Sequence, residues 1–475
     1  MIDRSPGAFV RFGIDSLGTG DKPTLILGTI VLSLVIGAYA GVFAIRHRVA
    51  GDVFFVVFGA LGFLAAIDGP GSSFAAALTA ALCAVAAGIV SLRVLLEQAS
   101  QPATYERPTA PTGPRRSTVV LTSRRRFLAL GGGLAAAALV SGTIGRALLD
   151  RVSVAAARAK VLLPRPRRPA SPVPAGSSFA VAGIAPLITP NDRPYRVDTT
   201  LNVPQVDPDR WRLRVHGRVD HPFELTFAEV LAMPMVEEHV TLACVSNEVG
   251  GPYIGTAKWL GVPLPALFER AGVQRGADQI VGRSVDDFTV GFPTAAALDG
   301  RTALLAVGMN GEPLPVKHGF PARLVVAGLY GYVSATKWIT ELEATTFAAY
   351  DAYWVPRGWA QQAPIKTESR IDVPRGGASV AAGPVAVAGV AWAPTRGIEA
   401  VEVQIDGRPW KRAQLAAAVS KETWRQWRYE WHAGRGSHEI RVRATDGTGR
   451  RQTADEAPPP PNGATGYHTV VVEVT

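Results

Sequence analysis

Residues 310–323 read Asn-Gly-Glu-Pro-Leu-Pro-Val-Lys-His-Gly-Phe-Pro-Ala-Arg, and residues 328–338 read Gly-Leu-Tyr-Gly-Tyr-Val-Ser-Ala-Thr-Lys-Trp. The glycines allow backbone N–H groups to approach an anion closely. Arg323 and Lys337 can hold a phosphate, the arginine through two parallel hydrogen bonds. On the residues alone, a hairpin with a cationic rim explains the two stretches equally well.

The surrounding region, about residues 180–370, mixes strand and helix patterns without a regular alternation. Apolar and polar residues alternate over 211–215, as in a strand with one buried face. Thr226 and Glu229 are spaced as the capping box that begins a short helix. Further strands are predicted at 236–244, 279–283, 302–308, 322–327 and 337–344. This mixture predicts an α+β domain.

Cys244 ends one of these predicted strands, directly before a Gly-rich loop at 247–255. The only other cysteine is Cys83, so a disulfide framework and a Cys-rich zinc module are excluded. A lone cysteine is most often a small buried hydrophobic residue. It can also be a nucleophile, with His239 as the local candidate base, or a soft thiolate ligand to one metal ion.

The chain lacks several common catalytic signatures. It contains no G-x-x-x-x-G-K-[ST], G-x-S-x-G, H-E-x-x-H or C-x-x-C motif. The haem attachment motif C-x-x-C-H is also missing from the sequence. Electrons would therefore pass to or from a separate carrier, or through the membrane segment.

The two Gly-rich stretches resemble the pterin-binding core of the sulfite oxidase family of molybdenum enzymes. Cys244 falls at the position of the single cysteine that ligates molybdenum in that family. The resemblance covers about residues 180–475 and includes several motifs in the family's order. These motifs are H-G-F-P-x-R at 318–323, the Gly-x-x-Gly turn at 328–331, Lys-Trp at 337–338, Trp-Leu-Gly-Val-Pro-Leu at 259–264 and the loop Asn-Asp-Arg-Pro-Tyr-Arg at 191–196.

The resemblance implies a Mo-molybdopterin cofactor and oxygen-atom transfer between a substrate and the metal. Cys244 would be the catalytic metal ligand, beside two sulfurs of the pterin dithiolene. His318 and Arg323 would bind the pterin, and Arg323 with Lys337 its phosphate, while 334–336 would add backbone N–H contacts. The implied cofactor-binding residues are Asn191, Tyr195, Cys244, His318, Arg323, Ser334, Ala335, Thr336 and Lys337.

The sequence departs from the sulfite-oxidising members at two places. Val245–Val249, with the acidic Glu248, stands where those members carry an arginine-rich stretch. Val307 or Gly308 stands where they carry an active-site tyrosine. Fewer cations disfavour a dianion such as sulfite, so a neutral S-oxide or N-oxide, or a methionine sulfoxide in a protein, is an equal candidate. Arg196 is a catalytic candidate that meets an anionic substrate, or else forms an ordinary ion pair.

The last hundred residues follow a Pro/Gly boundary at 373–377. Short alternating strands are predicted at 386–390, 400–404, 427–431, 439–444 and 470–475. This pattern indicates a β-sandwich of immunoglobulin-like type without its disulfide. By resemblance it corresponds to the family's dimerisation domain, which makes a homodimer the predicted assembly.

The N-terminal part is strongly apolar and carries the excess positive charge. Residues 1–170 hold 19 Lys and Arg against 8 Asp and Glu, whereas 171–475 hold 30 against 31. The net charge of +10 therefore indicates membrane topology, and nucleic acid is excluded as a partner on charge grounds. Four transmembrane helices are predicted, at 23–45, 53–67, 69–92 and 127–145.

Arginines in the first and third connecting loops fit the cytoplasm, which places the region after residue 150 on the outer side of the cell membrane. Ser123–Leu128 resembles a twin-arginine export signal, although an ordinary arginine cluster flanking a helix fits equally well. The predicted organisation is a membrane domain at 1–150, a Pro/Arg-rich linker at 151–179, a molybdopterin-binding domain at 180–370 and the Ig-like sandwich at 371–475. The alternative is a non-catalytic membrane-anchored scaffold of the same fold.

Overall fold

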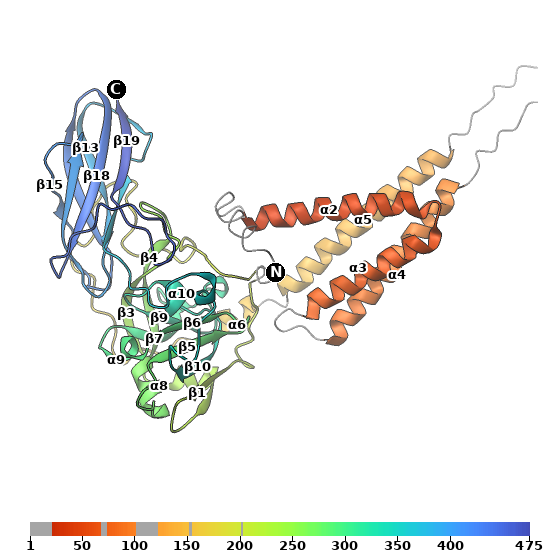
Figure 1. Cartoon of the computed structure of the whole chain (residues 1–475), viewed down its shortest axis with the longest axis horizontal. Coiled ribbons are helices and arrows are strands. Elements are labelled where there is room, and N and C mark those ends of the chain that lie inside the picture. Colours follow the sequence, from red (N-terminus) through yellow and green to blue (C-terminus); the bar gives the residue numbers. More distant parts are fainter. Residues whose placement is uncertain (1–20, 68–73, 101–121, 152–153, 201–202) are drawn as a thin grey trace, which may run out of the picture. The chain divides into compact units, whose positions relative to one another are not determined.

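The computed structural model describes residues 21–67, 74–100, 122–151, 154–200 and 203–475 (Figure 1). The chain divides into two compact units, Met1–Ser153 and Val154–Thr475. The first unit is helical in its described residues. The second contains the sheets and the pocket described below.

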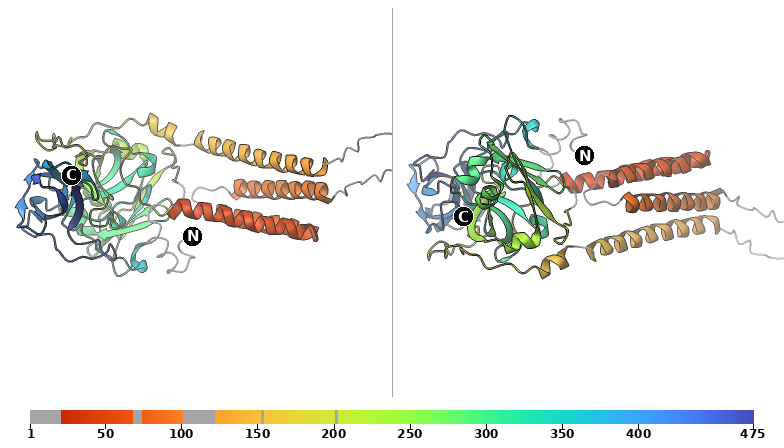
Figure 2. Two further views of the ribbon diagram at one scale, coloured as in Figure 1. Left: turned by 90° about the horizontal axis from the view of Figure 1, so that it is seen from above. Right: turned by 90° about the horizontal axis from the view of Figure 1, so that it is seen from below.

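The first unit contains helices that run side by side (Figure 2). They are α2 (Asp21–Ala44), α3 (Arg48–Ile67), α4 (Phe74–Ser100) and α5 (Thr122–Arg151). In the described residues α2, α3 and α4 contain segments that are long and apolar enough to cross a membrane. The short predicted span at 53–67 is thus part of a 20-residue helix. It includes Asp52, whose Oδ2 pairs with Arg93 of α4 at 2.6 Å.

The fourth predicted span does not reach the same length in the described residues. Its apolar stretch, Leu128–Thr143, is shorter than the other three, although α5 itself has 30 residues. The membrane crossing at 127–145 therefore stays a prediction. The side chains of Arg124–Arg126, on which the twin-arginine signal depends, lie outside the described residues.

The second unit begins with a segment that lies along the edge of a sheet. After α6 (Ala155–Lys160), Arg168 forms a parallel bridge with Val236 of strand β3 (Val236–Ala243). Arg158 donates from Nε to the Leu314 carbonyl at 2.8 Å. Much of the Pro/Arg-rich segment predicted as a linker is therefore bound to the sheet domain.

Two five-stranded sheets form the next part of this unit. The first contains β1 (Arg212–Gly217), β2 (Phe223–Thr226), β5 (Gln279–Ser284), β6 (Thr289–Pro293) and β10 (Ile339–Thr345). The second contains β3, β4 (Ile254–Pro263), β7 (Ala303–Met309), β8 (Glu312–Pro313) and β9 (Arg323–Val326). Their orders are β2-β1-β10-β5-β6 and β3-β4-β7-β8, with β9 also paired to β7. The strands predicted around the two Gly-rich stretches are confirmed as β7, β9 and β10.

Short helices connect and cover these strands. They are α7 (Phe227–Ala232), α8 (Leu264–Ala271), α9 (Thr294–Leu298), α10 (Gly331–Ser334) and the 3-10 turns η3 (Val316–His318) and η4 (Val355–Arg357). The Thr226 side chain accepts from the Glu229 N–H, and the Glu229 carboxylate accepts from the Thr226 N–H, so the predicted capping box is confirmed. Helices and strands are mixed, which agrees with the predicted α+β class.

The C-terminal part consists of two further sheets. Their strands are β11 (Glu368–Val373), β12 (Ser379–Val380), β13 (Gly383–Trp392), β14 (Ile398–Ile405), β15 (Lys411–Arg412), β16 (Gln414–Leu415), β17 (Arg425–Ala433), β18 (Gly436–Asp446) and β19 (His468–Val474). The orders are β11-β13-β17-β16 and β12-β19-β18-β14-β15. Alternating apolar residues of both sheets share one core, which includes Val387, Trp427 and Ile440. The predicted β-rich region is confirmed, and its immunoglobulin type stays a prediction.

Candidate active-site pocket

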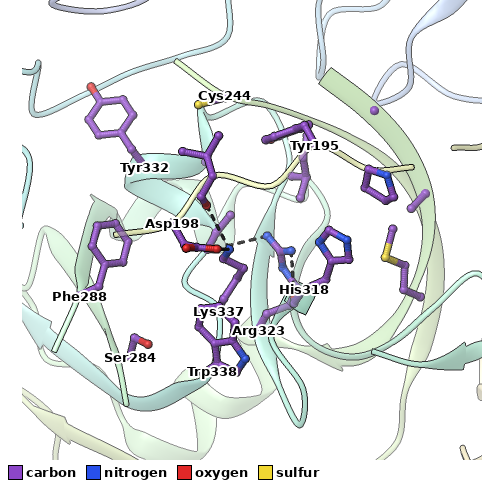
Figure 3. Close-up of a pocket in the computed structure, with 18 of the residues that line it drawn as sticks. Tyr195, Asp198, Cys244, Ser284, Phe288, His318, Arg323, Tyr332, Lys337 and Trp338 are labelled. Atoms are coloured by element: carbon purple, nitrogen blue, oxygen red, sulfur yellow. Dashed lines mark hydrogen bonds and ion pairs between the residues drawn. The ribbon is translucent and has the colours of Figure 1, made fainter. Parts of the chain in front are cut away.

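A deep pocket opens in the α+β part of the second unit (Figure 3). The space between its walls, open solvent at the mouth included, is about 1050 Å³. One wall is the loop at 189–199, and the others come from β3, β4, the end of β7 and the turn after α10. The predicted residues that line it are Tyr195, Cys244, His318, Arg323, Ala335 and Lys337.

Cys244 lies where β3 ends and its loop begins. Its backbone N–H donates to the Tyr253 carbonyl, and its own carbonyl accepts from the Asn247 N–H. The residue is only 7% exposed. Burial raises the pKa of the thiol, although hydrogen bonds from Ser246 and the charge of Lys337 act in the opposite direction. A raised pKa keeps the free thiol protonated, which disfavours an activated nucleophile.

The candidate base for a thiol mechanism is not beside this cysteine in the pocket. His239 lies five residues upstream on β3 and is absent from the pocket lining. Burial lowers its pKa. The described geometry therefore gives no support to a Cys–His nucleophile.

The loop after Cys244 contacts residues of the C-terminal sheets. Arg370 of β11 donates from Nη1 to the Gly251 carbonyl at 2.9 Å. Gly250 has φ +79°, and its α-carbon lies so close to the His468 ring that a side chain would collide with it. The C-terminal region thus holds the cysteine loop in place.

His318 and Arg323 come from the predicted H-G-F-P-x-R motif and lie on one side of the pocket (Figure 3). His318 is 3% exposed, and its Nε2 has no hydrogen-bond partner among the described residues. Burial, together with the charges of Arg323 and Lys337, lowers its pKa to about 3, so the ring is neutral at physiological pH.

The Arg323 guanidinium is buried without a carboxylate. It donates to the carbonyls of His318 at 3.2 Å and Ala335 at 3.4 Å, and stacks 5.1 Å from the Trp259 ring. Among the described residues no Asp or Glu pairs with it. Burial lowers its pKa to about 10, so it remains charged at neutral pH. A buried cation without an acidic partner favours binding of an anion.

Lys337 has an acidic partner that the sequence patterns did not reveal. Its Nζ lies 2.9 Å from Asp198 Oδ2 and donates to the Val197 carbonyl at 3.1 Å. Arg196 approaches the same carboxylate, with its Nε 2.7 Å from Oδ2. Burial lowers the pKa of Lys337 to about 8, although Asp198 acts in the opposite direction.

Four of the predicted residues do not line the pocket. Arg196 is one of them, because its side chain is committed to Asp198. Asn191 donates to the Met309 carbonyl, Ser334 to the Leu329 and Tyr330 carbonyls, and Thr336 to the Gly282 carbonyl. These bonds shape the walls of the pocket.

One predicted cofactor contact meets a conflict. The Ala335 N–H already donates to the Gly331 carbonyl at 3.0 Å because it ends the short helix α10. That group therefore has a partner within the chain, even though Ala335 lines the pocket. The cofactor contact predicted for this N–H stays a prediction, and its partner in the structure is the Gly331 carbonyl.

An aromatic wall was not found from the sequence. Phe288, Tyr332 and Trp354 line the pocket, and Tyr332 also donates through its hydroxyl to the Ala360 carbonyl. Beside them, Ser284 Oγ and Asp286 Oδ1 are buried without hydrogen-bond partners among the described residues. The clustering of aromatic residues at 350–359 was an available signal for Trp354 alone.

The residues present fit a molybdopterin cofactor. No group of three or more His, Cys, Asp or Glu side chains in the described residues is arranged to hold a metal ion. A metal at Cys244 would take its other ligands from a cofactor, as a dithiolene provides. The unpartnered Nε2 of His318 and the uncompensated charge of Arg323 offer a hydrogen bond and an anion contact in the same pocket.

Comparison with known proteins agrees with this fit. The model of the oxidoreductase molybdopterin binding domain matches residues 200–354. Mitochondrial sulfite oxidase of Homo sapiens is 29% identical over 302 residues, which cover 54% of this chain and 55% of that protein. The chain thus spans about half the length of the sulfite oxidases it matches.

A bacterial relative is covered more fully. The uncharacterized oxidoreductase YuiH of Bacillus subtilis is 33% identical over 174 residues, which are 37% of this chain and 80% of that protein. The crystal structure of the sulfane dehydrogenase SoxCD from Paracoccus pantotrophus has the same fold, with a TM-score of 0.54 at 23% identity. That likeness covers 61% of this chain and 82% of the SoxCD chain.

Proposed function

Because the chain belongs to the sulfite oxidase family of molybdopterin-dependent oxidoreductases, we propose that it catalyses oxygen-atom transfer with Cys244 as the protein ligand to molybdenum. One observation carries this proposal. The buried Cys244 shares a single pocket with the unpartnered nitrogen of His318 and the uncompensated guanidinium of Arg323. A thiol, a hydrogen-bonding group and a cation together suit a sulfur-ligated metal and an anionic pterin.

Each residue then has a separate task. Cys244 gives a soft thiolate, and metal binding releases its proton despite the raised pKa of the free thiol. Neutral His318 offers Nε2 to the pterin, while Arg323 and Lys337 bind the phosphate. When bound, the cofactor supplies two-electron oxygen-atom chemistry, and the protein orients it and sets its electrostatics.

We propose a neutral S-oxide or N-oxide as substrate in preference to sulfite. Phe288, Tyr332 and Trp354 give the pocket a largely apolar wall, and sulfur and methyl groups pack well against aromatic rings. Val307 and Gly308, either of which stands at the tyrosine position, are buried in β7 and supply no polar side chain. Glu248 after the cysteine adds no cation for a dianion to meet.

The cellular setting follows from the N-terminal unit. We propose that its apolar helices anchor the enzyme in the cell membrane with the pocket on the outer side, after export through the twin-arginine signal. Electrons would be exchanged with a separate carrier. The C-terminal sheets would form an immunoglobulin-like domain that supports a homodimer.

The test is elemental analysis of the full-length protein purified in detergent from a molybdenum-replete host. We expect close to one molybdenum per chain, and dye-linked turnover of dimethyl sulfoxide or trimethylamine N-oxide exceeding that of sulfite. Cys244→Ser should abolish turnover, whereas Cys83→Ser, a change in the apolar helix α4, should leave it intact.

Two other outcomes would change the proposal. Well-folded protein without molybdenum would favour the membrane-anchored scaffold. Full activity of the Cys244→Ser protein would exclude Cys244 as the metal ligand, and faster turnover of sulfite would overturn the substrate class.

A further inference from the structure

The loop that contains Asp198 forms one wall of the pocket and is joined to Lys337 by an ion pair and a hydrogen bond. Thr189, Tyr195, Asp198 and Thr199 of this loop line the pocket, as does Lys337. In Figure 3 a dashed line joins Lys337 to Asp198, which lies directly beside it.

The Asp198 carboxylate is nearly inaccessible to solvent. Its side chain is 4% exposed, and that of Lys337 is 12% exposed. Arg196 adds a second contact, with Nη2 3.3 Å from Asp198 Oδ1. The contacts of Asp198 Oδ2 with Lys337 Nζ at 2.9 Å and with Arg196 Nε at 2.7 Å have the length of strong charge-assisted hydrogen bonds. Asp198 therefore occupies the position from which an anion would contact Lys337.

The cations in and beside the pocket outnumber the carboxylate that pairs with them. Arg196, Lys337 and Asp198 sum to +1, because two cations face one carboxylate. Arg323 contributes a further +1 with carbonyl partners only. A dianionic phosphate ester can use Arg323 at once, but Lys337 is already paired.

We propose that Asp198 is an internal counter-ion that holds Lys337 until the cofactor enters, and that the cofactor phosphate displaces this carboxylate. The inference rests on the proposed cofactor. Before loading, the pair avoids an unpartnered buried lysine and keeps the loop at 189–200 against the pocket. On loading, the anion takes over Lys337, and Asp198 with Arg196 swings away and frees the loop.

The displacement of Asp198 from Lys337 is tested with inorganic phosphate as the anion. The protein is the full-length chain, purified in detergent from a host unable to make molybdopterin. Phosphate is titrated calorimetrically at constant ionic strength. Asp198→Asn should bind phosphate at least about 10-fold more tightly than the wild type, because the competing charge is gone. Asp198→Glu keeps the charge and should stay within about 3-fold of the wild type.

The control is Asp207→Asn, which changes an exposed carboxylate 3.8 Å from Arg210 and should leave phosphate binding unaltered. Equal or weaker phosphate binding by Asp198→Asn would overturn the proposal, because it would make Asp198 a residue that positions Lys337 for the anion.

A second measurement needs no variant. Hydrogen exchange of residues 193–200 in the cofactor-free wild type should become faster when phosphate binds, because the ion pair opens. Unchanged or slower exchange with phosphate bound would contradict the displacement. Neither result depends on molybdenum, so the metal analysis tests the proposed function separately.

Discussion

Two buried charged centres in this chain are built in opposite ways. In the C-terminal sheets, the Asp446 carboxylate is fully buried and accepts hydrogen bonds from Thr367 Oγ1 at 2.7 Å, Arg396 Nε at 2.8 Å and Thr448 Oγ1 at 2.6 Å. In the pocket, Arg323 has only carbonyl partners and His318 Nε2 has none among the described residues.

The difference is visible in the acid–base behaviour of the two centres. Burial raises the pKa of Asp446, but hydrogen bonds from Thr448, Thr367 and Arg396 outweigh burial and lower it. In the pocket, burial dominates and lowers the pKa of both His318 and Arg323. A buried charged group whose hydrogen bonds are all made within the protein stabilises the fold. A buried polar group without such partners is available to a ligand.

The largest effect on stability is expected from removing the Asp446 carboxylate, whose hydrogen bonds are all made within the protein. Asp446→Ala removes the buried acceptor shared by Arg396, Thr367 and Thr448 and should lower the free energy of unfolding by about 3–5 kcal/mol. Urea titration of the cofactor-free chain measures this. Asp455→Ala, in an exposed loop, is the control and should change the stability by less than about 0.5 kcal/mol. Equal effects of the two changes would contradict the structural role of Asp446.

The contact between the two regions can be broken at Gly250. Gly250→Ala combines a left-handed backbone with a collision against His468, so a loss of about 2–4 kcal/mol is expected. Molybdenum content should fall as well, since Cys244 lies in the same loop. Gly300→Ala is the control. Gly300 has a similar left-handed backbone, with φ +88°, but a side chain there would meet only open space. Melting temperatures and metal analysis of both variants decide whether the collision matters.

Removing the charge of Arg323 in the pocket should have the opposite pattern of effects, with a loss of cofactor and little change in stability. Arg323→Met should reduce cofactor content by about 10-fold or more, which corresponds to about 1.4 kcal/mol of binding free energy. The stability of the cofactor-free chain should change little, because an uncompensated buried cation is removed. Arg210→Met serves as the exposed control. A large loss of stability without cofactor would show that Arg323 is mainly structural.

The smallest effect concerns Glu368, which begins β11 and is 4% exposed. Burial raises its pKa to about 8 from 4.5, against the opposing charge of Lys366. The folded chain therefore retains a proton that the unfolded chain loses, and stability falls as pH rises from about 4.5 to about 8. Glu368→Gln should be more stable than the wild type by about 1–2 kcal/mol at pH 9 and equal to it near pH 4.5. Unfolding titrations at both pH values test this sign.

Several elements were predictable because their signals are local in the sequence. Thr226 and Glu229 are three residues apart, and their capping box formed as predicted. The strands β7, β9 and β10 follow apolar runs bounded by glycines. Of the site, Cys244, His318 and Arg323 were identified through the resemblance to the sulfite oxidase family, and their roles at a cofactor stay predictions.

The membrane unit shows where such signals reach their limit. Hydropathy located α2, α3 and α4, whereas the crossing predicted at 127–145 stays a prediction, since the ends of that span lie outside the described side chains. The Pro/Arg-rich segment resembled a free spacer, because a sequence cannot show that Arg168 bridges Val236 on the edge of a sheet.

By itself, the sequence determined the family, through several short motifs, and the apolar N-terminal helices, through uncharged runs, because each of these signals is local in the chain. Only the tertiary structure decided which charges in the pocket are paired. Asp198 and Lys337 are separated by 139 positions, and no local pattern links them. Whether a buried group is satisfied depends on all its neighbours in space, and that property distinguishes the pocket from the Asp446 centre.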